Sequence, residues 1–254
     1  MLERLKMEII ISKDKIDLGK AAAKQGSFLI QQAISENGKA NIIVATGASQ
    51  FEMLEVLVRE DIDWKVVTCF HLDEYIGLPE THPASFRKYL KERFADIVTP
   101  AAFYYVNGEG DVKMECARLH NLIVQHPIDV AFVGIGENGH LAFNDPPADF
   151  EIEDAYLEVE LDEPCRMQQL GEGWFKNISE VPAKAISMSI NRIMQSEHII
   201  CSVPDKRKAI AVEKVVEGSV TPEVPASILQ EHRSTYLFLD QDSSGLVTKN
   251  SQKE

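Results

Sequence analysis

The chain has 254 residues, of which 44% are hydrophobic, enough to bury a substantial core in one large or two small domains. Its formal net charge of −14 disfavours a nucleic acid or an anionic membrane surface as a binding partner. No apolar run approaches the roughly 18 residues of a membrane span, and the N-terminal residues are too polar for a secretory signal. The four cysteines are scattered without a C-x-x-C pair, so we expect reduced thiols in a cytoplasmic protein.

The first half of the chain alternates short apolar runs with helical patterns. The run at 41–45 shows no polar alternation, which is typical of a parallel strand covered on both faces. A helical pattern over 16–37 ends at Gly38, the expected C-terminal cap. We predict strands at 7–12, 41–45, 65–70, 102–106 and 129–133, and helices at 16–37, 50–59, 84–97 and 111–125. This order predicts an α/β fold with a doubly wound, mostly parallel sheet and helices on both faces.

The turn Thr46-Gly47-Ala48-Ser49 joins a predicted strand to a predicted helix. Backbone N–H groups and hydroxyls at such a junction form a ready anion-binding site. On this tetrapeptide alone, however, a plain N-terminal cap at Ser49 is the favoured interpretation.

The next predicted strand runs into the segment HLDEYIGL, residues 71–78. Acidic residues at the carboxyl end of a buried strand lie where α/β sheets hold their catalytic groups. Because successive strand residues point to opposite faces, Asp73 and Glu74 should not both enter one pocket. Asp73 could instead cap the following segment. A metal site on His71 and Asp73 lacks a recognisable third ligand, so we expect no metal.

The segment VGIGENGHLAFNDPP, residues 133–147, follows the predicted strand at 129–133. Its glycines let the backbone turn tightly and leave room for a ligand. Within it lie an amide, an imidazole and a carboxylate, from Asn138, His140 and Asp145, a set suited to proton transfer. A structural glycine loop with a satisfied histidine is the alternative.

Residues 134–139 of this segment also fit the dinucleotide-binding pattern G-x-G-x-x-G. That motif needs a helix to begin within it, and the two prolines at 146 and 147 exclude a helix of ordinary length here. Nicotinamide binding is therefore disfavoured.

In the second half we predict strands at 156–161, 185–189, 199–203 and 235–240, and helical segments at 166–175, 191–195, 205–217 and 225–232. The alternation of apolar and acidic residues in 156–161 indicates an edge strand. The cations at 206–208 oppose the helix dipole unless an anion binds there. No change in composition divides the chain, so we expect a single domain over 1–245 and a polar tail over 246–254.

Four segments, in this order and spacing, resemble the glucosamine-6-phosphate deaminase (isomerase) family: Thr46–Ser49, Leu72–Leu78, Gly136–Pro146, and Lys208-Ala209 with Pro225–Ser227. The resemblance spans nearly the whole chain, and LDEYIGL and NGHLAFN are its specific blocks. It implies a Rossmann-like fold and conversion of glucosamine 6-phosphate and water to fructose 6-phosphate and ammonia, with no redox cofactor. The 6-phosphogluconolactonases share the fold and a similar glycine turn but are less similar in both blocks.

The resemblance also assigns roles to residues. Asp73 would carry the C2 proton of the open-chain sugar to C1. His140 would open the ring as an acid/base, oriented by Asn138 and Asp145. The phosphate would be held by the remaining set, Thr46, Gly47, Ala48, Ser49 and Lys208.

Two departures from the family pattern affect these roles. Asp145 replaces the usual Glu, so its contact with His140 is lost, bridged by water or kept by a shifted loop. The family's phosphate-binding arginine, in an S-R-F-F-like run before a V-P pair, is absent before Val181-Pro182, where the chain has residues 173–175, GWF. Arg166 is the candidate replacement.

Three functions therefore remain on the same scaffold: an amino-sugar phosphate deaminase, a lactone hydrolase in which His140 activates water, or a sugar-phosphate sensor without catalysis. The hexosamine, the allosteric regulation and the assembly, for which a homo-oligomer such as a dimer or hexamer is reasonable, stay open.

Overall fold

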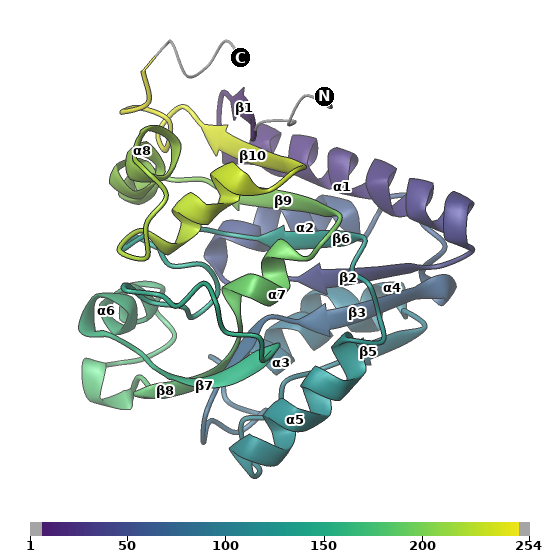
Figure 1. Ribbon diagram of the computed structural model, residues 1–254, viewed down its shortest axis with the longest axis horizontal. Helices are drawn as coiled ribbons and strands as arrows, with labels where there is room; N and C mark the ends of the chain where they lie inside the picture. Colours follow the sequence, from purple (N-terminus) through teal and green to yellow (C-terminus); the bar gives the residue numbers. More distant parts are fainter. Residues whose placement is uncertain (1–6, 249–254) are drawn as a thin grey trace.

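The computed structural model describes residues 7–248, so residues 249–254 of the expected polar tail lie outside the described part. Seven strands form one sheet in which every pairing is parallel. Their order across the sheet is β1 (Glu8–Ser12), β10 (Thr235–Asp240), β9 (His198–Val203), β6 (Val130–Val133), β2 (Ala40–Val44), β3 (Val67–His71) and β5 (Ala102–Tyr104). The predicted parallel α/β sheet is confirmed (Figure 1).

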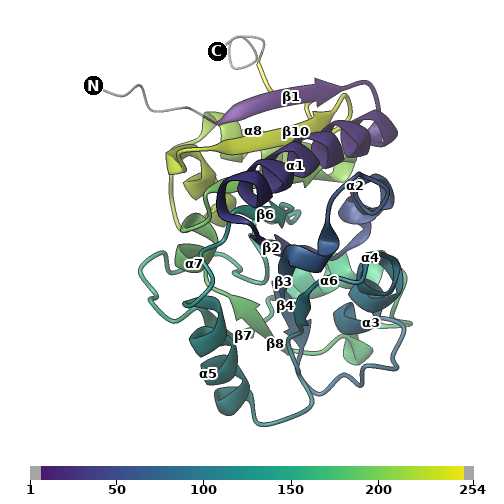
Figure 2. The same cartoon turned by 90° about the vertical axis from the view of Figure 1, so that its right-hand side faces the viewer.

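Helices cover both faces of this sheet (Figure 1, Figure 2). One face packs against α1 (Lys15–Asn37), α2 (Phe51–Leu57), α3 (Phe86–Leu90), the π-helical segment η3 (Lys91–Ala95) and α4 (Asp96–Val98). The other face packs against α5 (Val112–Ile123), α7 (Ile190–Met194), α8 (Ala209–Glu217) and the 3₁₀ segment η6 (Pro225–Glu231). The predicted caps of two helices are present, Gly38 with φ 73° after α1 and Asp111 before α5.

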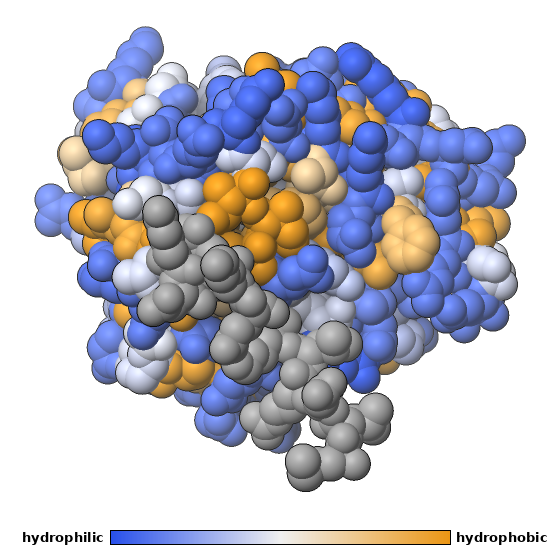
Figure 3. Space-filling model, turned by 90° about the horizontal axis from the view of Figure 1, so that it is seen from above, coloured by the Kyte–Doolittle hydropathy of each residue, from blue (hydrophilic) through white to orange (hydrophobic). Residues whose placement is uncertain are grey.

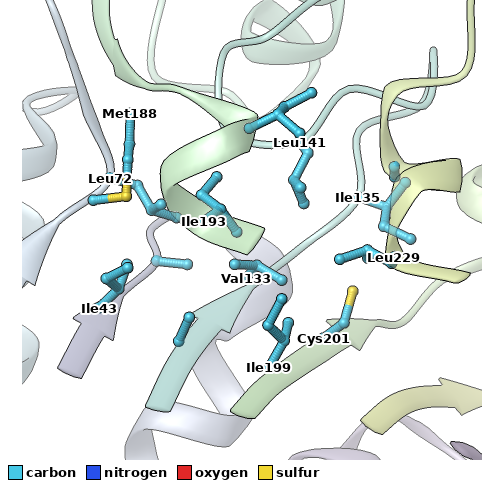
Figure 4. Packing of buried hydrophobic residues seen from close by; sticks show 14 of the residues in the cluster. Ile43, Leu72, Val133, Ile135, Leu141, Met188, Ile193, Ile199, Cys201 and Leu229 are labelled. Atoms are coloured by element: carbon cyan, nitrogen blue, oxygen red, sulfur yellow. The ribbon is translucent and has the colours of Figure 1, made fainter. Parts of the chain in front are cut away.

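Successive side chains of the buried strands point to opposite faces of the sheet, so the core is divided into two apolar clusters, one on each face. In β2, Ile43 belongs to one apolar cluster, whereas Ile42 and Val44 belong to the other. Figure 4 shows side chains such as Ile43 and Val133 directed toward Ile193 of α7. The surface seen in Figure 3 is mainly hydrophilic, with apolar side chains in small patches. Among residues 7–248 no helix is both long and apolar enough to cross a membrane.

The direction of winding reverses between β2 and β6. From β2 the chain moves outward through β3 to β5, then returns to β6 and continues outward through β9 to β10. Loops that leave the carboxyl ends of strands at such a point diverge and open a crevice. The segments after β3, β2, β6 and β9, which are neighbours in the sheet, are the ones that carry the candidate site residues.

A second sheet departs from the prediction. The strand expected at 185–189 does not join the main sheet but pairs as β8 (Lys184–Met188) with β4 (Asp73–Tyr75) and β7 (Tyr156–Glu160). Both pairings are antiparallel, and β7 lies at an edge, as its alternation predicts. Helix α6 (Glu163–Gly171) and the 3₁₀ turn η4 (Ile178–Glu180) pack beside this sheet.

Some helix bounds also differ from the prediction. The helix expected at 50–59 begins at Phe51, after a 3₁₀ turn η1 (Ala48–Gln50) that has no side-chain cap, so Ser49 is not an N-cap. The helix expected at 84–97 is interrupted by the π-helical η3. Short 3₁₀ turns also precede β3, as η2 (Trp64–Val66), and α8, as η5 (Lys206–Lys208).

Candidate active site

A cavity of about 260 Å³ opens at the carboxyl ends of the central strands. Its lining includes Asp73, His140, Lys208 and the whole turn from Thr46 to Ser49. Four separate strand ends therefore converge on one space, which is the arrangement that the proposed proton transfers and anion binding require.

Asp73 is the first residue of β4 and is 6% exposed. Its backbone is fixed by the antiparallel pairing with Ser187 of β8. Burial, with the nearby Glu74 carboxylate as a second cause, raises the pKa of Asp73 to about 8. A carboxylate with this pKa is basic enough to remove a proton near neutral pH.

The neighbouring Glu74 points away from the cavity, as strand geometry predicts. It is fully buried and accepts hydrogen bonds from the Ser85 hydroxyl and from the N–H groups of Tyr75, Phe86 and Arg87. The Arg87 guanidinium lies 3.3 Å from its carboxylate. Glu74 therefore ties β4 to the start of α3 and leaves Asp73 free for chemistry.

His140 forms a cluster with Asn138 and Asp145. Its Nδ1 lies 3.1 Å from Asp145 Oδ1, although the direction is not that of a regular hydrogen bond. The Asn138 amide donates to Asp145 Oδ1 at 3.0 Å, and its carbonyl oxygen accepts from the His140 N–H at 3.0 Å. The shorter Asp145 thus keeps its contact with the imidazole.

Asp145 is held as an anion by this cluster. Burial alone would raise the pKa of Asp145, but His140, Asn138 and the Asp162 N–H together outweigh it, so the pKa lies below the ordinary value. The Asp162 N–H donates to Oδ2 at 3.0 Å. An ionised carboxylate next to Nδ1 favours a proton on that nitrogen and leaves Nε2 for exchange with a substrate.

Glycine is required at two places in this loop. A methyl group built on Gly136 would lie 2.3 Å from the His140 ring, so only glycine leaves room for the imidazole. Gly139 has φ +90°, a conformation that side chains rarely adopt.

The turn at Thr46–Ser49 is positioned by a buried amide that the sequence did not single out. Gln50 is fully buried, and its Nε2 lies within hydrogen-bonding distance of Ser49 Oγ, Val133 O and Ser202 O, at 3.0, 3.5 and 3.4 Å. One side chain therefore connects the ends of β2, β6 and β9. The sequence offers little signal for this role, because Gln50 is one of several polar residues at the start of the predicted helix.

Lys208 brings a cation to the cavity. It is 6% exposed and has no ion-pair partner within the described part of the chain, and burial lowers its pKa to about 8. The neighbouring Arg207 instead pairs with Glu137 at 3.2 Å and Asp205 at 3.4 Å. Lys208 is thus the cation best placed to receive an anionic ligand.

Arg166 requires a correction. It does not line the cavity, and its guanidinium donates to the carbonyls of Ile178 and Val181 at 2.7 and 2.8 Å. Both bonds lie on the segment that follows α6, so Arg166 fastens this segment to the helix. The prediction that Arg166 replaces the family's phosphate-binding arginine is therefore wrong.

Two groups of side chains could be considered for a metal. His140, Asp145 and Cys165 place ligand atoms within 4.8 Å of one another, but burial raises the pKa of the Cys165 thiol well above its usual range, which disfavours the thiolate. At the other candidate pair, His71 accepts from the Val106 N–H and does not line the cavity that Asp73 enters.

Comparison with known proteins agrees with this geometry. Residues 13–238 match the family model described as glucosamine-6-phosphate isomerases/6-phosphogluconolactonase. The chain is 34% identical over 242 residues to a glucosamine-6-phosphate deaminase of Lactobacillus delbrueckii subsp. bulgaricus, covering 95% of this chain and 100% of the relative. It is 33% identical to one of Oenococcus oeni, covering 96% and 100% of the two chains.

Among solved structures, a monomeric glucosamine-6-phosphate deaminase superposes with a TM-score of 0.85 at 29% identity, covering 94% of this chain and 100% of its own. A 6-phosphogluconolactonase from Trypanosoma brucei has a TM-score of 0.79 at 15% identity, covering 96% and 100%, which shows a shared fold alone. The match over nearly the whole chain, together with the deaminase relatives, shows that this protein belongs to the glucosamine-6-phosphate isomerase/6-phosphogluconolactonase family.

Proposed function

We propose that the protein is an isomerising deaminase that converts glucosamine 6-phosphate and water to fructose 6-phosphate and ammonia. The observation that carries the proposal is a buried carboxylate of raised pKa, Asp73, in the same cavity as the His140–Asp145 pair. The two relatives described above, which cover 95% and 96% of this chain, are named glucosamine-6-phosphate deaminases.

Ring opening is the first step. His140 transfers a proton to the ring oxygen and takes up the proton of the C1 hydroxyl, which gives the open-chain aldehyde. Asp145 keeps the imidazole oriented.

Isomerisation and loss of ammonia follow. The Asp73 carboxylate takes the proton from C2 while His140 returns a proton to the C1 oxygen, which gives a cis-enolamine. Asp73 then delivers its proton to C1, one bond away. The product is an imine at C2, to which water adds. Collapse of the carbinolamine expels ammonia and leaves the C2 ketone. Asp73 ends each cycle as a carboxylate, so the base is regenerated.

The turn from Thr46 to Ser49 and the Lys208 ammonium would hold the 6-phosphate. Backbone N–H groups fix the phosphate oxygens, and Lys208 supplies a point charge. Since burial lowers the pKa of Lys208 to about 8, its contribution should fade as the pH rises through that value.

The direct test measures ammonia released from glucosamine 6-phosphate. We expect Asp73→Asn to abolish turnover and His140→Gln to reduce it by about 10²-fold or more, because each removes a proton-transfer group. Full activity in Asp73→Asn would refute the assigned base. Comparing ammonia release from galactosamine 6-phosphate with that from glucosamine 6-phosphate identifies which hexosamine is the substrate.

The alternative functions are distinguished with the same proteins. Hydrolysis of 6-phosphogluconolactone that survives Asp73→Asn would indicate a lactonase instead. Thermal stabilisation by a hexosamine 6-phosphate without any turnover would indicate a sensor. The sequence leaves open whether the protein forms a dimer or a hexamer, and light scattering of the purified protein measures its oligomeric state. The solved deaminase described above is monomeric.

A further inference from the structure

An acidic side chain lies where the proposed function needs a phosphate. Glu172 follows the last residue of α6, and its N–H donates to the Gln168 carbonyl at 3.1 Å. The chain then turns at Gly173, which has φ +86°. This turn directs Glu172 into the cavity that also contains the Thr46–Ser49 turn.

The Glu172 carboxylate contacts the anion-binding turn itself. A methyl group built on Gly47 would lie 4.0 Å from Glu172 Oε1, and the nearby Ala48 N–H lowers the pKa of this carboxylate. Its other oxygen, Oε2, is buried and has no hydrogen-bond partner within residues 7–248. The carboxylate therefore lies beside the backbone N–H groups that a phosphate would use, and one of its buried oxygens has no partner in the described part of the chain.

The charged and titratable groups around Glu172 come from several elements. Lys208 and Arg207 of η5 act on it as cations, without an ion pair of 4.0 Å or less to Glu172. The side chain of Gln168 in α6 lowers the pKa of Glu172, and the charge of Glu172 acts on the hydroxyls of Tyr75 and Tyr89. Burial raises the pKa of Glu172, while Lys208, Ala48 and Gln168 each lower it, and burial prevails.

We infer that Glu172 occupies the phosphate subsite when no ligand is bound, and that an incoming phosphate must either displace this carboxylate or cause it to take up a proton. The inference rests on the proposed function and deepens it. Two anions on one turn repel strongly in a partly buried site, and the unpaired Oε2 can become an O–H donor to a phosphate oxygen. Glu172 therefore weakens phosphate binding at this subsite, and most strongly at a pH where its carboxylate is ionised.

The sign of the pH effect follows from two groups. A bound dianion raises the pKa of Glu172 further, so binding takes up a proton on the acid side of neutrality. Above pH of about 8 the anion would instead bind with proton uptake by Lys208. At pH 6 Lys208 is already charged, but the His140 imidazole lines the same cavity and can also take up a proton. The difference in proton uptake between wild type and Glu172→Gln therefore reports on Glu172.

The experiment uses sulfate, a tetrahedral dianion that does not titrate near neutral pH. Titration calorimetry at pH 6 in two buffers of different ionisation enthalpy gives both the affinity and the number of protons taken up. We expect wild type to bind sulfate with proton uptake. Glu172→Gln should bind about tenfold or more tightly and take up fewer protons than wild type, since the amide has nearly the same size and carries no charge.

Glu172→Arg should bind sulfate more tightly than Glu172→Gln. The control is Glu163→Gln, which removes the same charge from an exposed position in α6 and should behave as wild type. Equal sulfate affinity and equal proton uptake in wild type and Glu172→Gln would overturn the inference. So would failure of wild type and both Glu172 variants to bind sulfate, because the turn would then hold no anion.

Turnover separates this inference from the proposed function. If ammonia is released from glucosamine 6-phosphate, Glu172→Gln should lower the KM by about tenfold near pH 7.5 and leave kcat within about twofold, because the carboxylate opposes phosphate binding and not the chemistry. If no ammonia is released by any variant, the proposed function fails while the sulfate result still decides the role of Glu172.

Discussion

Asp73 carries two properties that are difficult to combine at one residue. It must be buried to be basic, and it must reach a substrate; the structure places it 6% exposed but still on the cavity wall. Burial and the Glu74 carboxylate raise the pKa of Asp73 to about 8 from an ordinary value of 3.8. At pH values between these two numbers the folded protein holds a proton that the unfolded chain has lost.

This proton linkage predicts how stability depends on pH. Because the folded pKa is raised, the free energy of unfolding should fall as the pH rises from about 4 to about 8, then level off. Asp73→Asn cannot ionise, so its stability relative to wild type should grow across that window, by about 1.4 kcal/mol per pH unit at most.

Urea unfolding of wild type and Asp73→Asn at several pH values measures this difference. Asp61→Asn, the same change at an exposed position, provides the control and should show no such trend. A stability difference that stays constant with pH would contradict the raised pKa of Asp73.

At the scale of elements, the loop after β6 determines where the imidazole lies. Its backbone is closed by the bond from the Gly136 N–H to the His140 carbonyl at 2.9 Å, and the ring of His140 occupies the space over Gly136. Gly134 of the same loop packs closely against the anion turn, because a methyl group there would lie 3.0 Å from Gln50 Nε2 and 3.2 Å from Ser49 Oγ. The loop therefore requires glycine at 136, whereas a side chain at 134 would require a small shift of these neighbours.

We expect Gly136→Ala to displace the imidazole and lower kcat by about 10²-fold, since a shift of about 1 Å in a catalytic group has that effect. Circular dichroism should show a folded protein, because the overlap is with one side chain. Gly110→Ala, where the added methyl group meets no atom closer than 3.7 Å, serves as the control and should retain activity. Unchanged kcat in Gly136→Ala would mean that His140 does not act from this position.

At the scale of the whole molecule, the site lies between two sheets. The parallel sheet supplies the anion turn and the His140 loop, whereas Asp73 belongs to the antiparallel sheet. Asn144 joins the two: its amide donates to the carbonyls of Leu141, in the loop, and Met188, in β8, at 2.7 and 2.9 Å. Beside it the Phe143 N–H donates to Ser187 Oγ at 3.0 Å, and Ser187 is the strand partner of Asp73.

Asn144→Ala should therefore make the distance between the Asp73 carboxylate and the His140 imidazole less well fixed. We expect a loss of about 1–3 kcal/mol in the free energy of unfolding, from two buried carbonyls left without this donor, and a fall in kcat larger than the change in KM. Chemical denaturation and steady-state kinetics measure both. Asn191→Ala, a substitution outside the site, is the matched control. Wild-type kcat in Asn144→Ala would show that the two sheets hold their spacing without this amide.

Much of the fold followed from local patterns. Continuous apolar runs such as 41–45 gave parallel strands, because a strand covered on both faces has no polar side. The boundaries at Gly38 and Asp111 were predicted from capping chemistry, which depends only on neighbouring residues. The LDEYIGL and NGHLAFN blocks indicated the family, which the comparisons confirm.

The sequence could not place residues whose positions depend on distant partners. Asp73 pairs with Ser187 across more than a hundred positions, so neither β4 nor the second sheet was visible in any local window. Arg166 lies in α6 and Glu172 directly follows this helix. Glu172 nevertheless enters the cavity, whereas Arg166 binds carbonyls outside it.

The sequence by itself therefore determined the strand–turn–helix order, the parallel sheet and the kinds of chemical groups at its strand ends, because hydrophobic period and turn chemistry are local properties. Only the tertiary structure decided which of those groups share a cavity, what charge surrounds them and which are already engaged, because burial and pairing arise between segments far apart in the chain.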